Sequence, residues 1–295
     1  MGTRKRKLTA AEKAAKRKRR LKFETIFING KMTSMIRRFP YFAVACALAL
    51  LWSGCKTPSA NGITQVATID ALLAGVYDGH VSLATLRRHG DFGIGTYAGL
   101  DGEMILLDGK FYKLRADGKV YRPALSEQTP FACVTHFVPD RRESITNPTD
   151  LKALDARIAA LVPQQNRFCT FRLRGDFRRV RTRSVPLQHK PYPPLAQVTA
   201  TQTVFTLSNV RGALIGFRSP AFVKGVNVPG YHTHFLADDL SGGGHVLEFE
   251  MTRGILEADT VHEWLSIYLP TGSASFGEAD LTPDRTADLK AVEKQ

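Results

Sequence analysis

The sequence predicts an α+β protein with two mixed, mainly antiparallel β-sheet domains and a few helices. Strand patterns joined by Asp-Gly turns are frequent, whereas strand–helix–strand units are rare. A strongly periodic helix at residues 151–161 separates a mixed first half from a second half made mostly of strand patterns. With 295 residues, the chain is long enough for one large domain or for two modest ones.

Three segments follow from this pattern. Residues 1–56 form a basic head with a signal or lipoprotein segment. Residues 57–163 form an N-terminal α+β domain, and residues 164–295 form a β-rich C-terminal domain that carries a candidate metal site. The boundary is placed at Pro163, which ends the periodic helix and opens a short polar linker.

Positive charge is concentrated at the N-terminus. Residues 1–38 carry 14 of the 41 Lys and Arg residues but only two of the 27 acidic residues, so the rest of the chain holds 27 basic and 25 acidic side chains. The run Lys16–Arg20 resembles a nuclear-localisation or nucleic-acid tail. Because the remainder is close to neutral, it lacks the electrostatic footprint of a DNA or RNA binder, and we expect no nucleic-acid partner.

An apolar run of about eleven residues, 42–52, follows Arg37 and Arg38. A basic stretch before an apolar run of this length is typical of a signal peptide, and the run is too short to span a bilayer comfortably. It ends in Leu-Trp-Ser-Gly-Cys at residues 51–55, which resembles a bacterial lipobox with Cys55 as the lipidated residue. We therefore expect an exported protein anchored to a bacterial membrane through Cys55, in the periplasm or at the cell surface. A cytoplasmic protein is the alternative.

The N-terminal domain begins with two short helices and continues as hairpins. Residues 69–73 predict the first helix, and Ser82 is positioned to cap a second helix at residues 81–88. Asp-Gly turns then connect predicted strands at residues 103–107, 110–114 and 119–121. A further strand is predicted at residues 131–137, and the periodic helix at residues 151–161 closes the domain.

The C-terminal domain consists mostly of strands. Predicted strands cover residues 168–173, 177–185, 204–207, 213–217 and 245–251. A polar segment at residues 281–295 predicts a final helix with few apolar side chains. Cys133 and Cys169 each lie in an apolar, strand-like stretch. They could pair in an oxidising compartment, but the sequence does not place their Cα atoms, and we expect two buried free thiols.

A histidine cluster is the clearest chemical signal in the chain. Three of the eight histidines fall within residues 232–245, at the end of Pro-Gly-Tyr-His-Thr-His-Phe and after a run of three glycines. In an extended segment His232 and His234 point to the same side, and the glycine-rich turn returns His245 toward them. Three histidine ligands with an open position are typical of catalytic zinc. The other histidines have no partner at ligand spacing and are expected to be structural.

Two charged residues are candidates for the same site. Glu103 begins an otherwise apolar strand and, taken alone, is expected to be a solvated carboxylate at a strand end. Arg183 lies in a strand rich in arginine. Because side chains alternate, Arg179, Arg181 and Arg183 share one face, and the spacing alone does not single out one of them.

Several sequence blocks together carry a family resemblance. They are Gly-Ile-Gly-Thr (93–96), Leu-Asp-Gly-Glu-Met (100–104), Asp-Gly-Lys-Phe-Tyr (108–112), Thr-Pro-Phe-Ala (129–132), Arg-Ser-Val-Pro (183–186), Pro-Tyr (191–192), residues 212–220, the H-x-H block (229–235) and Gly-Gly-His (243–245). In this order they resemble the α-acetolactate decarboxylase family, from roughly residue 65 to the C-terminus.

The resemblance implies a carboxy-lyase that converts 2-acetolactate to (R)-acetoin and CO2 through a metal-stabilised enediolate. It implies Zn²⁺ bound by His232, His234 and His245, with Glu103 and Arg183 in the active site. The C-terminal block Asp-Leu-Lys-Ala-Val-Glu makes Glu293 the candidate for a second active-site glutamate. The small-molecule substrate is the expected partner. Whether the chain forms a homodimer is left open.

Two alternatives remain at this point. In a cupin-type metal oxygenase or isomerase, a carboxylate ligand follows the H-x-H pair closely, and Asp238 has a suitable spacing. A second cupin block is absent, however, and the blocks around Glu103 and Arg183 would have no counterpart. A non-catalytic zinc-binding lipoprotein would explain the histidines and Cys55, but it leaves Glu103 and Arg183 without a task.

Overall fold

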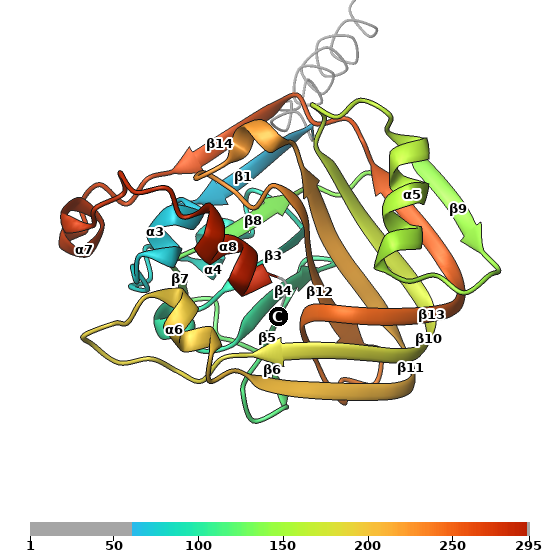
Figure 1. Ribbon diagram of the computed structural model, residues 1–295, viewed down its shortest axis with the longest axis horizontal. Coiled ribbons are helices and arrows are strands. Elements are labelled where there is room, and N and C mark those ends of the chain that lie inside the picture. The colour runs from blue at the N-terminus through green and yellow to red at the C-terminus, as the bar shows by residue number, and fades with distance from the viewer. Residues whose placement is uncertain (1–60, 294–295) are drawn as a thin grey trace, which may run out of the picture. The chain divides into compact units, whose positions relative to one another are not determined.

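The structure is a computed structural model, and it describes residues 61–293. These residues belong to one compact unit that contains two large β-sheets and several short helices (Figure 1). The predicted basic head, the apolar run at residues 42–52 and Cys55 lie outside the described residues. None of the described helices is long and apolar enough to cross a membrane.

The first sheet has seven strands and contains the predicted hairpins. Its strand order is β14 (Trp264–Tyr268), β1 (Gly62–Val66), β8 (Ala132–Thr135), β3 (Phe92–Thr96), β4 (Glu103–Leu107), β5 (Lys110–Leu114) and β6 (Val120–Tyr121). All neighbours are antiparallel except β1 and β14, which run parallel. Beside it, β2 (Val81–Ser82) pairs with β7 (Gln128–Thr129). The Asp-Gly turns therefore form hairpins as predicted, whereas β1 and β3 are strands that the pattern did not reveal.

The second sheet has five strands, three of them unusually long. It contains β10 (Cys169–Ser184), β11 (Thr203–Ser219), β12 (Gly230–Ala237), β13 (Gly243–Asp259) and β9 (Arg141–Ile145), in that order. Because β10 pairs with β13 as well as with β11, the strands from β10 to β13 close on one another. The two strands predicted on either side of Gly175 are a single strand, and so are the two predicted within 204–217.

Gly175 shows why β10 continues without a break. A side chain at Gly175 would collide with the Arg253 carbonyl oxygen of β13, so the glycine permits close approach of two strands and does not mark a turn. The register between β10 and β13 shifts just beyond it, at residues 176–179, where β-bulges let the strands bend. Gly175 is thus a strand residue and not a turn residue.

The helices are short and most have the caps that the sequence provides. They are α3 (Ile69–Leu73), α4 (Leu83–Leu86), α5 (Leu151–Leu161), α6 (Leu195–Thr199), α7 (Ala274–Glu278) and α8 (Thr286–Glu293), with 3₁₀ turns η1 (Ala98–Leu100) and η2 (Ala221–Val223). The Ser82 hydroxyl accepts a hydrogen bond from the Thr85 amide and caps α4, as predicted. The predicted helix is shorter than expected because Val81 and Ser82 pair with β7 instead.

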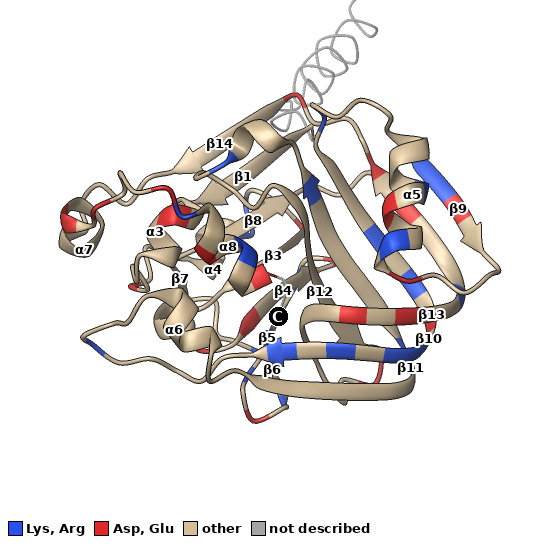
Figure 2. Ribbon diagram, viewed as in Figure 1, with Lys and Arg blue, Asp and Glu red and all other residues tan. Residues whose placement is uncertain are grey.

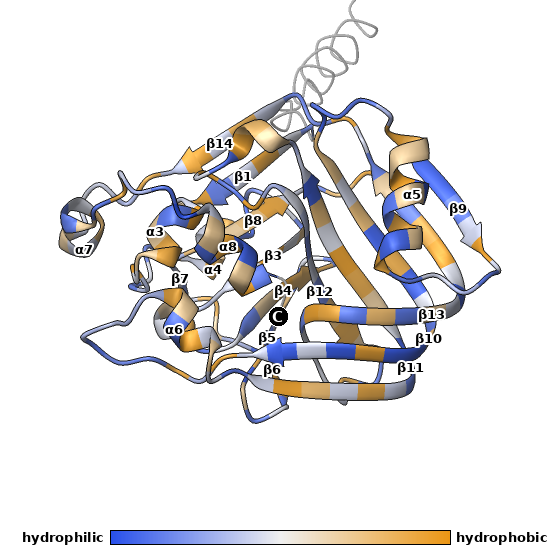
Figure 3. Cartoon of the chain, in the orientation of Figure 1, coloured by the Kyte–Doolittle hydropathy of each residue, from blue (hydrophilic) through white to orange (hydrophobic). Residues whose placement is uncertain are grey.

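Strand β4 shows how the two faces of the seven-stranded sheet are used. Ile105 and Leu107 pack into the apolar cluster that also includes side chains of α3, α6 and α8, whereas Met104 and Leu106 pack into a cluster with α4 on the other face. Both faces are therefore covered, and the orange bands on the strands in Figure 3 reflect these buried positions. The alternation places Glu103 on the face shared by Ile105 and Leu107.

The predicted boundary at residue 163 does not separate the two sheets. Strand β9 precedes the boundary but belongs to the five-stranded sheet, and β14 follows it but belongs to the seven-stranded sheet. The chain thus crosses between the sheets in both directions, a long-range arrangement that the local patterns could not report. The two cysteines outside the head are buried and unpaired, as expected, and burial raises the pKa of both thiols to about 12.

The arginines of β10 are mostly paired at the surface. Arg178 lies 3.2 Å from Glu250, and Arg179 lies 3.1 Å from Glu248, across the β10–β13 pair. Figure 2 shows this arrangement as blue positions on β10 beside red positions on β13. Exposed pairs of this kind contribute little to stability, so their main effect is to neutralise the charge of an arginine-rich strand.

Candidate functional site

The three predicted histidine ligands converge between the two sheets. His232 and His234 lie on β12, and His245 lies opposite His234 on β13. Their ring centroids are 5.2 to 5.5 Å apart. One ring nitrogen of each histidine lies within 4.8 Å of the corresponding nitrogens of the other two. Three imidazoles in this arrangement can bind a single metal ion.

The orientation of His234 is fixed by the backbone. Its Nδ1 lies 2.8 Å from the carbonyl oxygen of Met104 and must carry the proton to donate that hydrogen bond. The lone pair is therefore on Nε2, which is buried and has no hydrogen-bond partner among the described residues. A buried nitrogen without a partner is costly unless a ligand occupies it. The donor set thus fits a metal, with Met104 as the outer group that orients the ligand.

The protonation state of the cluster also suits a metal. Burial, followed by the nearby Arg183 charge, lowers the pKa of His232 to about 3. Burial also holds the pKa values of His234 and His245 well below the usual range, with neighbouring positive groups acting in the same direction. All three imidazoles are consequently neutral at physiological pH and can offer lone pairs without first losing a proton.

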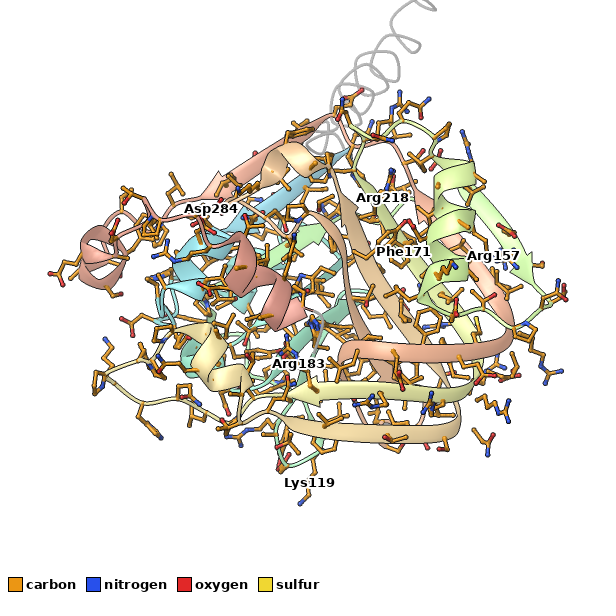
Figure 4. All side chains as sticks on the ribbon, viewed as in Figure 1. Lys119, Arg157, Phe171, Arg183, Arg218 and Asp284 are labelled. Carbon is orange, nitrogen blue, oxygen red and sulfur yellow. The ribbon has the colours of Figure 1, made fainter. Side chains whose placement is uncertain are left out.

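Arg183 is the one arginine of its strand face that enters the site. It is only 5% exposed, and Figure 4 shows it near the centre of the molecule, between the two sheets. Its Nη1 donates to Glu103 Oε1 at 3.2 Å, and its Nη2 donates to the Val292 carbonyl oxygen at 3.2 Å. Its Nε is buried and has no hydrogen-bond partner among the described residues. The guanidinium therefore keeps one nitrogen, Nε, without a partner beside the histidine cluster.

Glu103 is buried, contrary to the expectation for a strand-end carboxylate. It is 7% exposed because β4 lies between β3 and β5 and α8 covers its end of the sheet. Its Oε2 lies 3.5 Å from His234 Nε2. Burial raises its pKa to about 7, opposed by the Arg183 charge and reinforced by Glu293. The carboxyl can therefore exist in its protonated form near neutral pH.

Glu293 joins the same group from the last turn of α8. Its Oε2 lies 3.7 Å from His245 Nε2, and burial raises its pKa to about 7 against the opposing effect of Arg183. In Figure 1, α8 lies near β3 and β4, with its C-terminal end toward β12 and β13. All six residues singled out from the sequence thus surround one point in the fold.

A small internal cavity of about 40 Å³ lies at this point. Beside Glu103, Arg183, His232, His245 and Glu293 it is lined by nine residues to which the sequence assigned no role. Five of them lie in blocks that carry the family resemblance, namely Gly95, Thr96, Leu100, Phe131 and Val185, and the other four, Ile69, Leu72, Leu195 and Val292, lie outside those blocks. Most of these are apolar and come from helices and turns distant in sequence. Nothing in their local pattern distinguishes them from other core residues.

A larger groove of about 740 Å³ lies on the other side of α8. Leu289 and Lys290 of α8 line this groove together with the segments at residues 224–231 and 281–286. Glu293 lines both the groove and the internal cavity. The last turn of α8 therefore stands between the surface and the histidine cluster.

Asp238, the carboxylate ligand that a cupin-type site would require, lies elsewhere. It is exposed, its Oδ2 lies 3.5 Å from Arg211 Nε, and it is not part of the histidine group. The other buried histidine with close polar neighbours, His262, lies 3.2 Å from the Thr170 hydroxyl and also stays outside the cluster. The structure therefore does not support a cupin-type site.

Comparison with known families agrees with this site. A family model described as alpha-acetolactate decarboxylase matches residues 63–283. The matched range includes Glu103, Arg183 and the three clustered histidines. Glu293 lies beyond it, so its membership of the site depends on the position of α8 in the structure.

Individual proteins give the same result. An alpha-acetolactate decarboxylase of Methanosarcina mazei is 46% identical over 230 residues, which are 78% of this chain and 79% of that protein. That of Raoultella terrigena is 42% identical over 232 residues, 78% of this chain and 89% of that protein. The crystal structure of alpha-acetolactate decarboxylase from Bacillus subtilis strain 168 superposes with a TM-score of 0.77 at 37% identity and covers 79% of this chain and 100% of that one.

Proposed function

This chain belongs to the alpha-acetolactate decarboxylase family and is an acetolactate decarboxylase, and we propose that it works with a zinc ion and releases (R)-acetoin together with CO2. The observation that carries the proposal is the meeting of three neutral imidazoles, one arginine and two protonatable carboxyls around one buried cavity. His232, His234 and His245 would hold the zinc. The alternative of a non-catalytic zinc-binding protein is left without support.

The reaction requires that negative charge be accommodated when CO2 leaves. Zinc would supply a Lewis acid for the oxygen on which that charge develops. Glu103, Arg183, His234 and His245 are all buried, and in such a site fixed charges act more strongly than they do in water. The residues of the chain then have two further tasks, which are to hold the substrate carboxylate and to return a proton to carbon.

Arg183 is the candidate for holding the substrate carboxylate. Its guanidinium is held by Glu103 and by the Val292 carbonyl oxygen, and its Nε remains available to a carboxylate of the substrate. Because its donors lie in one plane, the guanidinium would fix both the position of the substrate carboxylate and the direction of the carbon–carbon bond that breaks when CO2 leaves.

Glu103 and Glu293 are the candidates for returning a proton to carbon. After CO2 departs, a proton must reach the carbon that carried it, and the face from which it arrives sets the handedness of the product. Both carboxyls have pKa values raised to about 7 by burial, so each can hold a proton near neutral pH. They approach the histidine cluster from different elements, β4 and α8, and we propose that one of them is the donor.

Metal removal tests the proposed function directly. We expect the full chain to form acetoin from racemic 2-acetolactate, to lose at least about 99% of that rate after chelation, and to regain it with Zn²⁺. Mg²⁺, which prefers oxygen ligands, is expected not to restore the rate. The measurement is acetoin formed per minute, with zinc content determined in parallel. A folded, zinc-loaded chain without turnover would contradict the proposal.

Exchanging each glutamate for glutamine tests the proton path. Glutamine keeps the size of the side chain but cannot deliver the proton, so the donor variant is expected to lose about 10²- to 10⁴-fold in kcat or to give product of altered handedness. Glu103→Gln and Glu293→Gln are compared by chiral chromatography of the acetoin. Glu257→Gln, which changes a carboxylate of β13 paired with Arg172, serves as the control. If both cavity variants keep the rate and the handedness, neither glutamate is the donor.

We further propose that the chain is exported and anchored through Cys55. The support is the order of basic residues, apolar run and lipobox-like ending in the sequence, which lies outside the described residues.

A further inference from the structure

The cavity at the histidine cluster has two chemically different sides. The strands supply most of the polar side, with Glu103, Arg183, His232 and His245, and the end of α8 adds Glu293. The helices supply much of the apolar side, with Ile69 and Leu72 from α3, Leu195 from α6 and Val292 from α8. A substrate bound here therefore has its oxygens facing the strands and its hydrocarbon part facing the helices.

The substrate itself has the matching asymmetry. In 2-acetolactate, the carbon that loses CO2 carries four branches, namely a carboxylate, a hydroxyl, an acetyl group and a methyl group. If the carboxylate lies at Arg183 and the two oxygens lie at the histidine cluster, as in the proposed function on which this inference rests, three branches point toward the strands. The tetrahedral geometry then directs the fourth branch, the methyl group, toward the helices.

We propose that Leu72 of α3 and Leu195 of α6 limit the size of this alkyl branch and so make the enzyme select a methyl group over larger groups. Both are buried, at 7% and 6% exposure, and both belong to the apolar cluster beneath the sheet. Packed side chains of this kind do not move aside without disturbing their neighbours. The whole cavity measures only about 40 Å³, so it offers little spare room beside these two side chains.

The position of Leu72 on α3 gives a matched control. Ile69 and Leu72 are three residues apart, which places them on one face of the helix, and both line the cavity. Leu73 is equally buried, at 3% exposure, and belongs to the same apolar cluster, but it does not line the cavity. Leu72→Ala and Leu73→Ala therefore remove the same atoms from the same helix, and only the first enlarges the site.

The test compares 2-acetolactate with its homologue that carries an ethyl group on the hydroxyl-bearing carbon. The measured quantity is the ratio of kcat/KM for the homologue to kcat/KM for 2-acetolactate. We expect this ratio to rise about tenfold in Leu72→Ala, because one methylene is worth tenfold or more in a fitted apolar pocket. In Leu73→Ala the ratio is expected to stay at the wild-type value. Leu195→Ala is expected to behave like Leu72→Ala, from a different helix.

The outcomes separate this inference from the proposed function. If the wild-type chain turns over 2-acetolactate but the ratio is the same in all three leucine variants, the inference is wrong and the function stands. If the zinc-loaded wild-type chain does not turn over 2-acetolactate, the proposed function fails first. Should Leu72→Ala not fold, Leu72→Val gives a smaller enlargement and the same expected direction, and an unchanged ratio there also overturns the inference.

Discussion

Replacing His234 with alanine is expected to remove the bound metal and to lower kcat on the order of a thousandfold or more. His234 is fully buried, and the Met104 carbonyl oxygen at 2.8 Å holds its Nε2 toward the other two histidines. The two remaining imidazoles, on β12 and β13, do not form a three-ligand site, so both the metal and its stabilisation of developing charge are lost. Zinc stoichiometry and kcat are measured on the same preparation.

A histidine outside the cluster provides the control. His80 is partly buried, and its Nε2 also has no hydrogen-bond partner among the described residues, but it lies outside the metal-binding group. His80→Ala is expected to keep the full zinc content and most of the rate. If His234→Ala retains stoichiometric zinc and wild-type kcat, the cluster is not the metal site of the reaction.

The histidine cluster could be predicted from sequence because its geometry is mostly local. Alternation along a strand places His232 and His234 on one side, and this holds in β12. The glycine run before His245 also has a physical reason. Gly244 adopts a φ of +136°, and a side chain there would lie 2.5 Å from the Arg183 carbonyl oxygen. The glycine thus lets the start of β13 approach β10 closely, which brings His245 beside Arg183.

The apolar wall of the cavity could not be predicted, because it depends on contacts between distant segments. Leu72 and Leu195 are more than 120 positions apart in the sequence, and each is an ordinary buried leucine of a five-residue helix. The parallel pairing of β1 with β14 joins segments about 200 positions apart, and it is equally invisible in any local pattern. Periodicity reports which face of an element is buried, but it does not report what covers that face.

Arg183 illustrates the same limit at a single residue. Alternation places Arg181 and Arg183 on one face of β10, and the sequence offers no reason to prefer either. In the structure Arg181 lies 3.5 Å from Glu248 at the surface, whereas Arg183 is covered by β4 and by the end of α8. The two arginines differ in burial because this face of β10 is exposed to solvent at Arg181 and enters the space between the two sheets at Arg183. The family resemblance, and not the spacing, pointed to Arg183, which is the arginine that the structure places beside Glu103.

Replacing Arg183 with lysine is expected to lower kcat/KM by about a hundredfold to a thousandfold. Lysine keeps the charge but replaces a planar set of donors with one ammonium group, which cannot serve Glu103, the Val292 carbonyl oxygen and a substrate carboxylate together. A small misplacement of the reacting group costs about this much in rate. Steady-state kinetics with 2-acetolactate measure the effect. Arg181→Lys, on the same strand face, is expected to leave kcat/KM unchanged within about twofold.

Whether the fall in kcat/KM comes from KM or from kcat distinguishes two possible roles of Arg183. If it mainly holds the substrate carboxylate, KM rises and zinc content stays complete. If it mainly positions its neighbours, kcat falls instead, because the Nη2 bond to the Val292 carbonyl oxygen steadies the turn of α8 that carries Glu293. An uncharged replacement such as Arg183→Gln would in addition remove the charge that opposes the upward shift of the Glu103 pKa, so that carboxyl would stay protonated to higher pH. A variant with wild-type KM and kcat would show that neither task belongs to Arg183.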